Sequence, residues 1–258
     1  MRTHDVRGRG RVGRTGGLAL AAALLLGGSA SADDASAKGR IEARLAKAGV
    51  AEQGQVDVSV KDGVAVLSGF TTTVAGQREA EKAARKETKT VDNRILVVSA
   101  ERDDEDISQA VADAVLGYVH YGVFDSVGVG VQDGVVTLKG SVLQPYRKQE
   151  IERRVARLEG VSQIRNDIRV QPASTFDDRL RLQLYSQIYG RGILQRFGSM
   201  TSPPVHIVVE NGNVTLTGVV NSRVEKAMLE SIARGTLSFR VDNQIEVEGE
   251  VAEPRSRT

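Results

Sequence analysis

The sequence has no cysteine and only three histidines among its 258 residues. Without cysteine the chain can form no disulfide, no thiolate zinc cluster and no lipid-modified N-terminal cysteine, and it cannot use thiol catalysis. His4, His120 and His206 are too few for a metal site. We therefore expect no metal or other cofactor, and each folded unit must be held by its apolar core alone.

No apolar run near the N-terminus is long enough to cross a bilayer. The apolar core there, residues 18–26, has nine residues, whereas a spanning helix needs about 20. An arginine-rich stretch precedes it, and Ala30-Ser31-Ala32 follows as an A-x-A cleavage pattern. This order predicts that residues 1–32 are a secretory signal peptide, removed on export to the periplasm. A retained N-terminal anchor is the alternative.

The chain also lacks a lasting excess of positive charge. It has 35 basic and 33 acidic residues, and removing residues 1–32 takes away five arginines and one aspartate, which leaves 30 and 32. A nucleic-acid-binding protein carries a basic footprint, so we expect no nucleic-acid partner. The basic stretch at residues 147–157 is interleaved with Glu150 and Glu152, as is typical of a solvated helix face.

The sequence also shows no recognisable set of catalytic residues. No combination of nucleophile, base and oxyanion donors recurs along the chain. The acidic cluster at residues 103–106 suits the positive end of a helix that begins there. The sequence therefore predicts a protein that is not an enzyme and has no small-molecule substrate.

What the chain does have is a phrase repeated three times, at residues 58–69, 129–140 and 207–218. Each copy is two alternating apolar segments around Asp-Gly or Asn-Gly, the dipeptides that favour a type I′ hairpin turn. The closing glycines are 71 and 78 positions apart, a spacing that suits small domains rather than a solenoid. The glycines assigned to turn or backbone geometry are Gly63, Gly69, Gly134, Gly140, Gly212 and Gly218.

Helical patterns flank every hairpin, and a third strand closes every copy. The closing strands share an alternation around one asparagine: Asn93, Asn166 and Asn243. The order is α-β-β-α-β, which predicts an α+β fold. We expect three tandem small modules, each a three-stranded mixed sheet with two helices packed on one face.

In this order, this hairpin phrase and this strand ending, the chain resembles the BON domain, named for bacterial osmotically induced periplasmic and nodulation proteins. We expect the copies to occupy residues 37–99, 104–171 and 176–248, and residues 249–258 to be a disordered tail. The third copy is the most divergent, because its first half is enlarged. The resemblance implies a peripheral association with phospholipid surfaces and protection of the envelope under osmotic or other stress.

The copies differ most between the first helix and the hairpin, where specificity usually resides. Six of the ten Phe and Tyr residues lie there. Tyr121, Phe124, Tyr189 and Phe197 are the candidate contacts with lipid or a partner, whereas Tyr118 and Tyr185 are better explained as part of the core.

Two functions stay open at this point. One is an exported, non-enzymatic protein that binds phospholipid surfaces in the bacterial envelope. The other is a periplasmic protein–protein adaptor or chaperone-like array of modules, held to an envelope protein. The sequence leaves the oligomeric state open.

Overall fold

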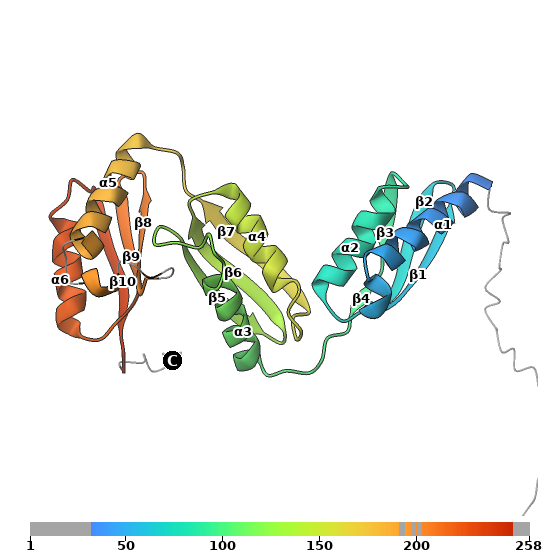
Figure 1. The fold of residues 1–258 in the computed structure, drawn as a ribbon, viewed down its shortest axis with the longest axis horizontal. Helices are drawn as coiled ribbons and strands as arrows, with labels where there is room; N and C mark the ends of the chain where they lie inside the picture. The colour runs from blue at the N-terminus through green and yellow to red at the C-terminus, as the bar shows by residue number, and fades with distance from the viewer. Residues whose placement is uncertain (1–31, 191–193, 198–199, 201–202, 250–258) are drawn as a thin grey trace, which may run out of the picture.

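The computed structural model describes residues 32–190, 194–197, 200 and 203–249. The predicted signal peptide, apart from Ala32, and the predicted tail, apart from Gly249, lie outside these residues. Within them the chain forms three α+β modules that follow one another along the molecule (Figure 1). In each module the helices cover one face of a mixed sheet, as the sequence predicts.

The three modules share one order of elements. Module 1 comprises α1 (Ala32–Lys47), the short η1 (Val50–Glu52), β1 (Gly54–Lys61), β2 (Val64–Thr71), α2 (Val74–Arg85), β3 (Thr90–Asn93) and β4 (Leu96–Val97). Module 2 comprises α3 (Asp104–Leu116), β5 (Ser126–Gln132), β6 (Val135–Val142), α4 (Pro145–Val155) and β7 (Gln163–Val170). Module 3 comprises α5 (Thr175–Tyr185), the π-helical turn η2 (Ser186–Gly190), the 3₁₀ turn η3 (Gln195–Phe197), β8 (Val205–Glu210), β9 (Asn213–Val220), α6 (Arg223–Arg234) and β10 (Arg240–Val247).

The hairpin supplies the first two strands of every sheet, and its second strand is central. It pairs antiparallel with the first strand and parallel with the last. The register is the same in each module: Leu67, Leu138 and Leu216 lie opposite the three asparagines. Equivalent residues therefore occupy equivalent places, and the copies can be compared position by position.

Each module has its own apolar core between helices and sheet, as the alternating strands require. One leucine of the central strand is fully buried in each core: Leu67, Leu138 and Leu216. The cores also reach across module boundaries. Val74 at the start of α2 is buried in the core of module 2, and Val123 and Phe124 of module 2 pack against that of module 3.

The last strand of module 1 departs from the expectation. A continuous strand over residues 91–97 is predicted, but the structure has β3 and β4 with a break at Arg94 and Ile95. At the break the side-chain amide of Gln77 donates to the carbonyl of Ile95 at 2.7 Å. A side chain of α2 therefore takes up a carbonyl at the point where the strand pairing is interrupted.

Candidate binding surfaces

One aspartate in each module connects the start of the first helix to the hairpin turn. The carboxylate of Asp104 accepts the backbone N–H groups of Asp133 and Gly134 at 2.8 and 2.9 Å. Asp34 and Asp177 do the same for their own turns, at 2.8–3.0 Å. The sequence interpretation missed this contact and assigned the acidic residues 103–106 only to the helix terminus. The signal was present, because an acidic residue stands in the first helical turn of all three copies.

The turns themselves have the backbone that the dipeptides predict. Both central residues have positive φ in each turn, for example 51° at Asp133 and 72° at Gly134, as a type I′ turn requires. Gly212 has a second constraint, because a Cβ there would lie 2.6 Å from the ring of Phe239. The ring of Phe239 therefore packs directly against the turn of module 3.

The glycines that close the phrase lie where no side chain fits. Gly69, Gly140 and Gly218 have φ of 104°, 117° and 117°. An added Cβ would approach the carbonyl oxygen of the opposite strand to 2.2, 2.1 and 2.0 Å. These positions therefore set backbone geometry inside the sheet and present nothing to a ligand.

The three asparagines fasten the last strand to the second helix. Each side-chain oxygen accepts the N–H of the isoleucine two residues on, at 3.1–3.2 Å. Each side-chain amide donates to a glutamate of the helix: Glu81, Glu152 or Glu230. The bond from Asn93 is the main cause that lowers the pKa of Glu81.

The structure places Tyr121, Phe124, Tyr189 and Phe197, the candidate contacts with lipid or a partner, against the cores of modules 2 and 3. Tyr121 and Tyr189 are buried, and their hydroxyls bond to the backbone of Val127 and Val205. Burial raises the pKa of the Tyr121 hydroxyl to about 12. Phe124 and Phe197 pack against the core of module 3. The reason is that the enlarged loops fold back onto the modules instead of projecting into solvent.

The loop that carries Tyr121 and Phe124 connects module 2 to module 3. The carbonyl of Val123 accepts the N–H of Ile207 in the edge strand β8 at 2.7 Å. The ring of Tyr121 lies against His206, with centroids 5.3 Å apart. His206 is buried here and its Nδ1 contacts the carbonyl of Gly122 at 3.3 Å. Burial is the main cause that lowers the pKa of His206.

The junction between modules 1 and 2 is formed by helix ends. The N–H of Ala75 in α2 donates to the carbonyl of Ala156, just after α4, at 2.8 Å. Arg78 and Glu152 form an ion pair across the junction at 2.6 Å. Together with buried Val74, these contacts hold the first two modules side by side.

Part of the basic stretch at residues 147–157 is paired with carboxylates or packed on a ring. Arg147 pairs with buried Asp125 at 2.5 Å, and Arg153 pairs with Glu150 at 2.6 Å. Arg154 lies over the ring of Tyr118, 5.0 Å from its centroid. This face of α4 therefore offers less positive charge than its composition suggests.

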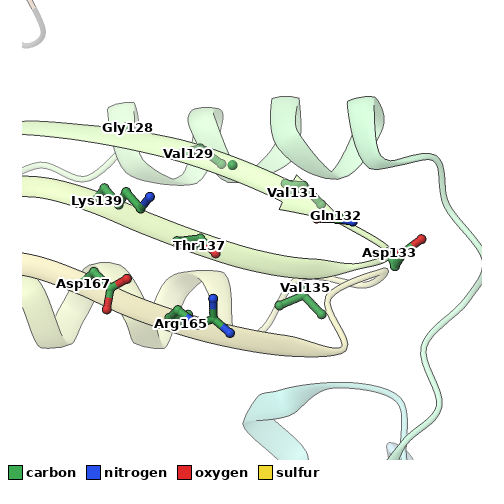
Figure 2. A pocket seen from close by; sticks show the side chains of 11 residues that line it. Gly128, Val129, Val131, Gln132, Asp133, Val135, Thr137, Lys139, Arg165 and Asp167 are labelled. Carbon is green, nitrogen blue, oxygen red and sulfur yellow. The ribbon is translucent and has the colours of Figure 1, made fainter. Parts of the chain in front are cut away.

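An open trough of about 750 Å³ lies on the face of the module 2 sheet that the helices leave uncovered. Figure 2 shows Thr137, Lys139, Arg165 and Asp167 along it, on the central strand and the last strand. Two outward positions in the middle of β5 are glycines, Gly128 and Gly130, so this part of the edge carries no side chain, whereas Gln132 lines the trough at the end of the strand. The trough is open and is lined by both charged and apolar residues, which suits an extended segment better than an enclosed small molecule.

In the part of the chain that the structure describes, no group of three or more His, Asp and Glu residues is arranged to hold a metal ion. Among the same residues, no helix has both the length and the apolar character needed to cross a membrane.

Comparison with protein families gives the decisive match. The BON domain model matches this chain three times, at residues 33–99, 103–172 and 192–249. The chain belongs to the BON domain family. The third BON match begins after α5, although α5 packs on the sheet of module 3 as α1 and α3 pack on theirs.

No curated protein matches the chain. Solved structures similar to this BON protein include the C-terminal domain of CdsD, a structural protein of the type III secretion system of Chlamydia trachomatis. It has 14% identity and a TM-score of 0.25, over 81% of this chain and 96% of that one. The periplasmic domain of PrgH from the type III secretion system of S. typhimurium gives 12% identity and a TM-score of 0.21, over 79% and 97%. Scores this low carry no argument about function.

Proposed function

We propose that this protein is an exported, non-enzymatic protein of the bacterial envelope, in which three BON modules associate peripherally with phospholipid surfaces and protect the envelope under stress. The observation that carries the proposal is the threefold match to the BON domain, a family linked to membrane and phospholipid binding and generally not catalytic. Three weak contacts on one chain reinforce one another through effective concentration. This effect supplies a physical reason for the tandem array.

Export and the periplasmic location rest on residues 1–32. The expected outcome is that the protein recovered from the periplasm begins at Asp33, as N-terminal mass spectrometry would show. A chain that keeps residues 1–32 in the membrane fraction would favour the anchor instead.

Co-sedimentation with vesicles tests the lipid association. The sample is residues 32–258, which contain all three cores and exclude the apolar residues 18–26. Because this chain has nearly equal numbers of basic and acidic residues, binding should depend on apolar contact and change little with ionic strength. The protein is expected in the pellet with vesicles of phosphatidylethanolamine and phosphatidylglycerol. Absence from the pellet with every lipid mixture would refute the proposal.

A protein–protein adaptor is the second candidate, and the trough of module 2 favours it. An extended segment could lie beside β5, since glycines at its outward positions leave the backbone accessible. Replacing Gly130 with a bulky residue, such as Gly130→Tyr, should then abolish capture of an envelope partner. Vesicle binding would stay unchanged in that variant.

A further inference from the structure

Module 3 presents an apolar tip formed by Phe176, Leu237 and Phe239. Leu237 is 81% exposed and Phe239 is 78% exposed, the highest values among the large apolar side chains of the described residues. Phe176 and Phe239 stack on each other, with centroids 5.8 Å apart and planes 19° apart. Projecting side chains of this kind mark a contact with an apolar partner.

The tip is held in place by the hairpin turn. The N–H of Phe239 donates to the carbonyl of Gly212 at 2.8 Å. A Cβ on Gly212 would meet both rings, that of Phe239 at 2.6 Å and that of Phe176 at 3.2 Å. Asp177, the residue after Phe176, binds the N–H groups of the same turn. The apolar side chains therefore stand on a fixed support, which lowers the entropy lost on binding.

The other two modules have no such tip. With the three asparagines as reference, Phe239 corresponds to Lys89 and Ser162. By the same alignment Leu237 corresponds to Glu87 and Gly160. Phe176 precedes the turn-binding aspartate, a place that Asp33 and Asp103 occupy in the other copies. The same scaffold thus carries large apolar side chains at these places in module 3 alone of the three modules.

Two arginines border the tip. Arg240 follows Phe239, and Arg179 is one turn after Phe176 on α5; both are exposed. Within the described residues neither forms an ion pair. The carboxylates nearby are engaged elsewhere: Asp178 pairs with Arg181 at 2.6 Å and Glu210 with Arg169 at 2.7 Å. An apolar tip bordered by two cations complements a surface with phosphates outside and acyl chains beneath.

We infer that this tip is the part of the molecule that enters the phospholipid surface, with Leu237 and Phe239 among the acyl chains and Arg179 and Arg240 at the headgroup phosphates. This inference rests on the proposed function and adds the point of contact. Modules 1 and 2 then position the tip instead of inserting themselves.

The chain has no tryptophan, so a single introduced tryptophan can report on the environment of the tip. In residues 32–258 the substitution Phe239→Trp places a single fluorophore at the tip, and Phe70→Trp places one at an exposed position of module 1. Vesicles of phosphatidylethanolamine and phosphatidylglycerol should shift the emission of the first variant to shorter wavelength and leave the second unchanged. A second pair, Leu237→Glu and Leu182→Glu, compares the tip with another exposed leucine of module 3. Leu237→Glu should weaken vesicle binding about tenfold, and Leu182→Glu should not.

The outcomes separate the two claims. If the unsubstituted chain sediments with vesicles but the tip fluorophore does not shift and Leu237→Glu binds normally, the inference fails while the proposed function stands. If the unsubstituted chain does not bind vesicles, both fail. If Leu237→Glu instead converts a dimer to a monomer in analytical ultracentrifugation without changing vesicle binding, the tip contacts a second copy and the lipid assignment is wrong.

Discussion

Asp34, Asp104 and Asp177 each bind two backbone N–H groups of a hairpin turn from the first turn of a helix. Each carboxylate therefore fixes where the helix begins relative to the sheet. Losing it leaves two turn N–H groups without their acceptor, and a hydrogen bond to a charged group contributes about 1.5–3 kcal/mol. At the scale of single residues, this contact fixes the position of the hairpin turn relative to the first helix in every module.

The substitution Asp104→Ala should lower the free energy of unfolding by about 2 kcal/mol. Asp106→Ala is the matched control, because Asp106 is also in the first turn of α3 but is exposed and away from the hairpin. Both substitutions remove one negative charge from the same helix terminus. Urea denaturation compares them, and equal losses would show that only the helix terminus matters.

The closing glycines give a second prediction at this scale. Gly140→Ala should destabilise module 2 by about 3 kcal/mol, because φ is positive and the new Cβ would collide with the carbonyl of Ser126. Gly128→Ala in the neighbouring strand should be close to neutral, since nothing lies within 4 Å of its Cβ position. Thermal unfolding followed by circular dichroism distinguishes the two. A stable Gly140→Ala variant would contradict this role.

At the scale of elements, the loop between α3 and β5 matters most, because it covers the edge strand β8 of the next module. His206 is buried in that contact between Tyr121 and the carbonyl of Gly122, with Asp125 nearby. Burial keeps its folded-state pKa below the ordinary value of 6.5. The unfolded chain therefore takes up a proton more readily as the pH falls.

The sign of the effect follows from linkage. Stability at this junction is complete above the unfolded pKa and decreases as the pH falls from about 6.5 toward the lower folded pKa. The melting temperature should drop between about pH 7.5 and about pH 5.5 by less in His206→Gln than in the natural chain. His120→Gln, at an exposed position of the same loop whose ring lies against Tyr118 and Tyr146 of module 2, should behave like the natural chain. Equal pH dependence in all three would rule out His206 as the cause.

The elements also show how far the sequence could be interpreted. Hairpins, type I′ turns and the α-β-β-α-β order were predictable, because they depend on local backbone preferences and on alternation within a few residues. The packing of Phe124 was not, because it depends on contacts with module 3, more than 60 residues away along the chain. Tyr121 belongs to the core of module 2, and its contact with His206 of module 3 was equally hidden in the sequence. Phe239 was overlooked for a related reason: only the shared register reveals that its counterparts are Lys89 and Ser162.

At the scale of the whole molecule, the modules contact one another through a few specific groups. Val74 is buried in the core of module 2 although it belongs to α2 of module 1. Val74→Asp should therefore separate the first two modules and increase the radius of gyration in solution scattering, while the far-ultraviolet circular dichroism stays unchanged. Val98→Asp, at an exposed position, serves as the control. An unchanged radius would show that Val74 does not hold the modules together.

Across the three modules, the residues that all copies share differ from the features that are candidates for binding. All three modules share the turn-binding aspartate, the closing glycine and the asparagine, so these residues explain the fold that the copies have in common. The open trough is on module 2 and the apolar tip is on module 3. Binding is therefore expected to depend on the differences between copies and not on the repeated phrase.

Amide hydrogen exchange of residues 32–258, with and without vesicles of phosphatidylethanolamine and phosphatidylglycerol, tests the association with phospholipid most directly. The account predicts slower exchange in the presence of vesicles at residues 174–178 and 235–240, with no change along residues 126–139 of the module 2 sheet. Exchange that vesicles leave unaltered throughout the chain would contradict it.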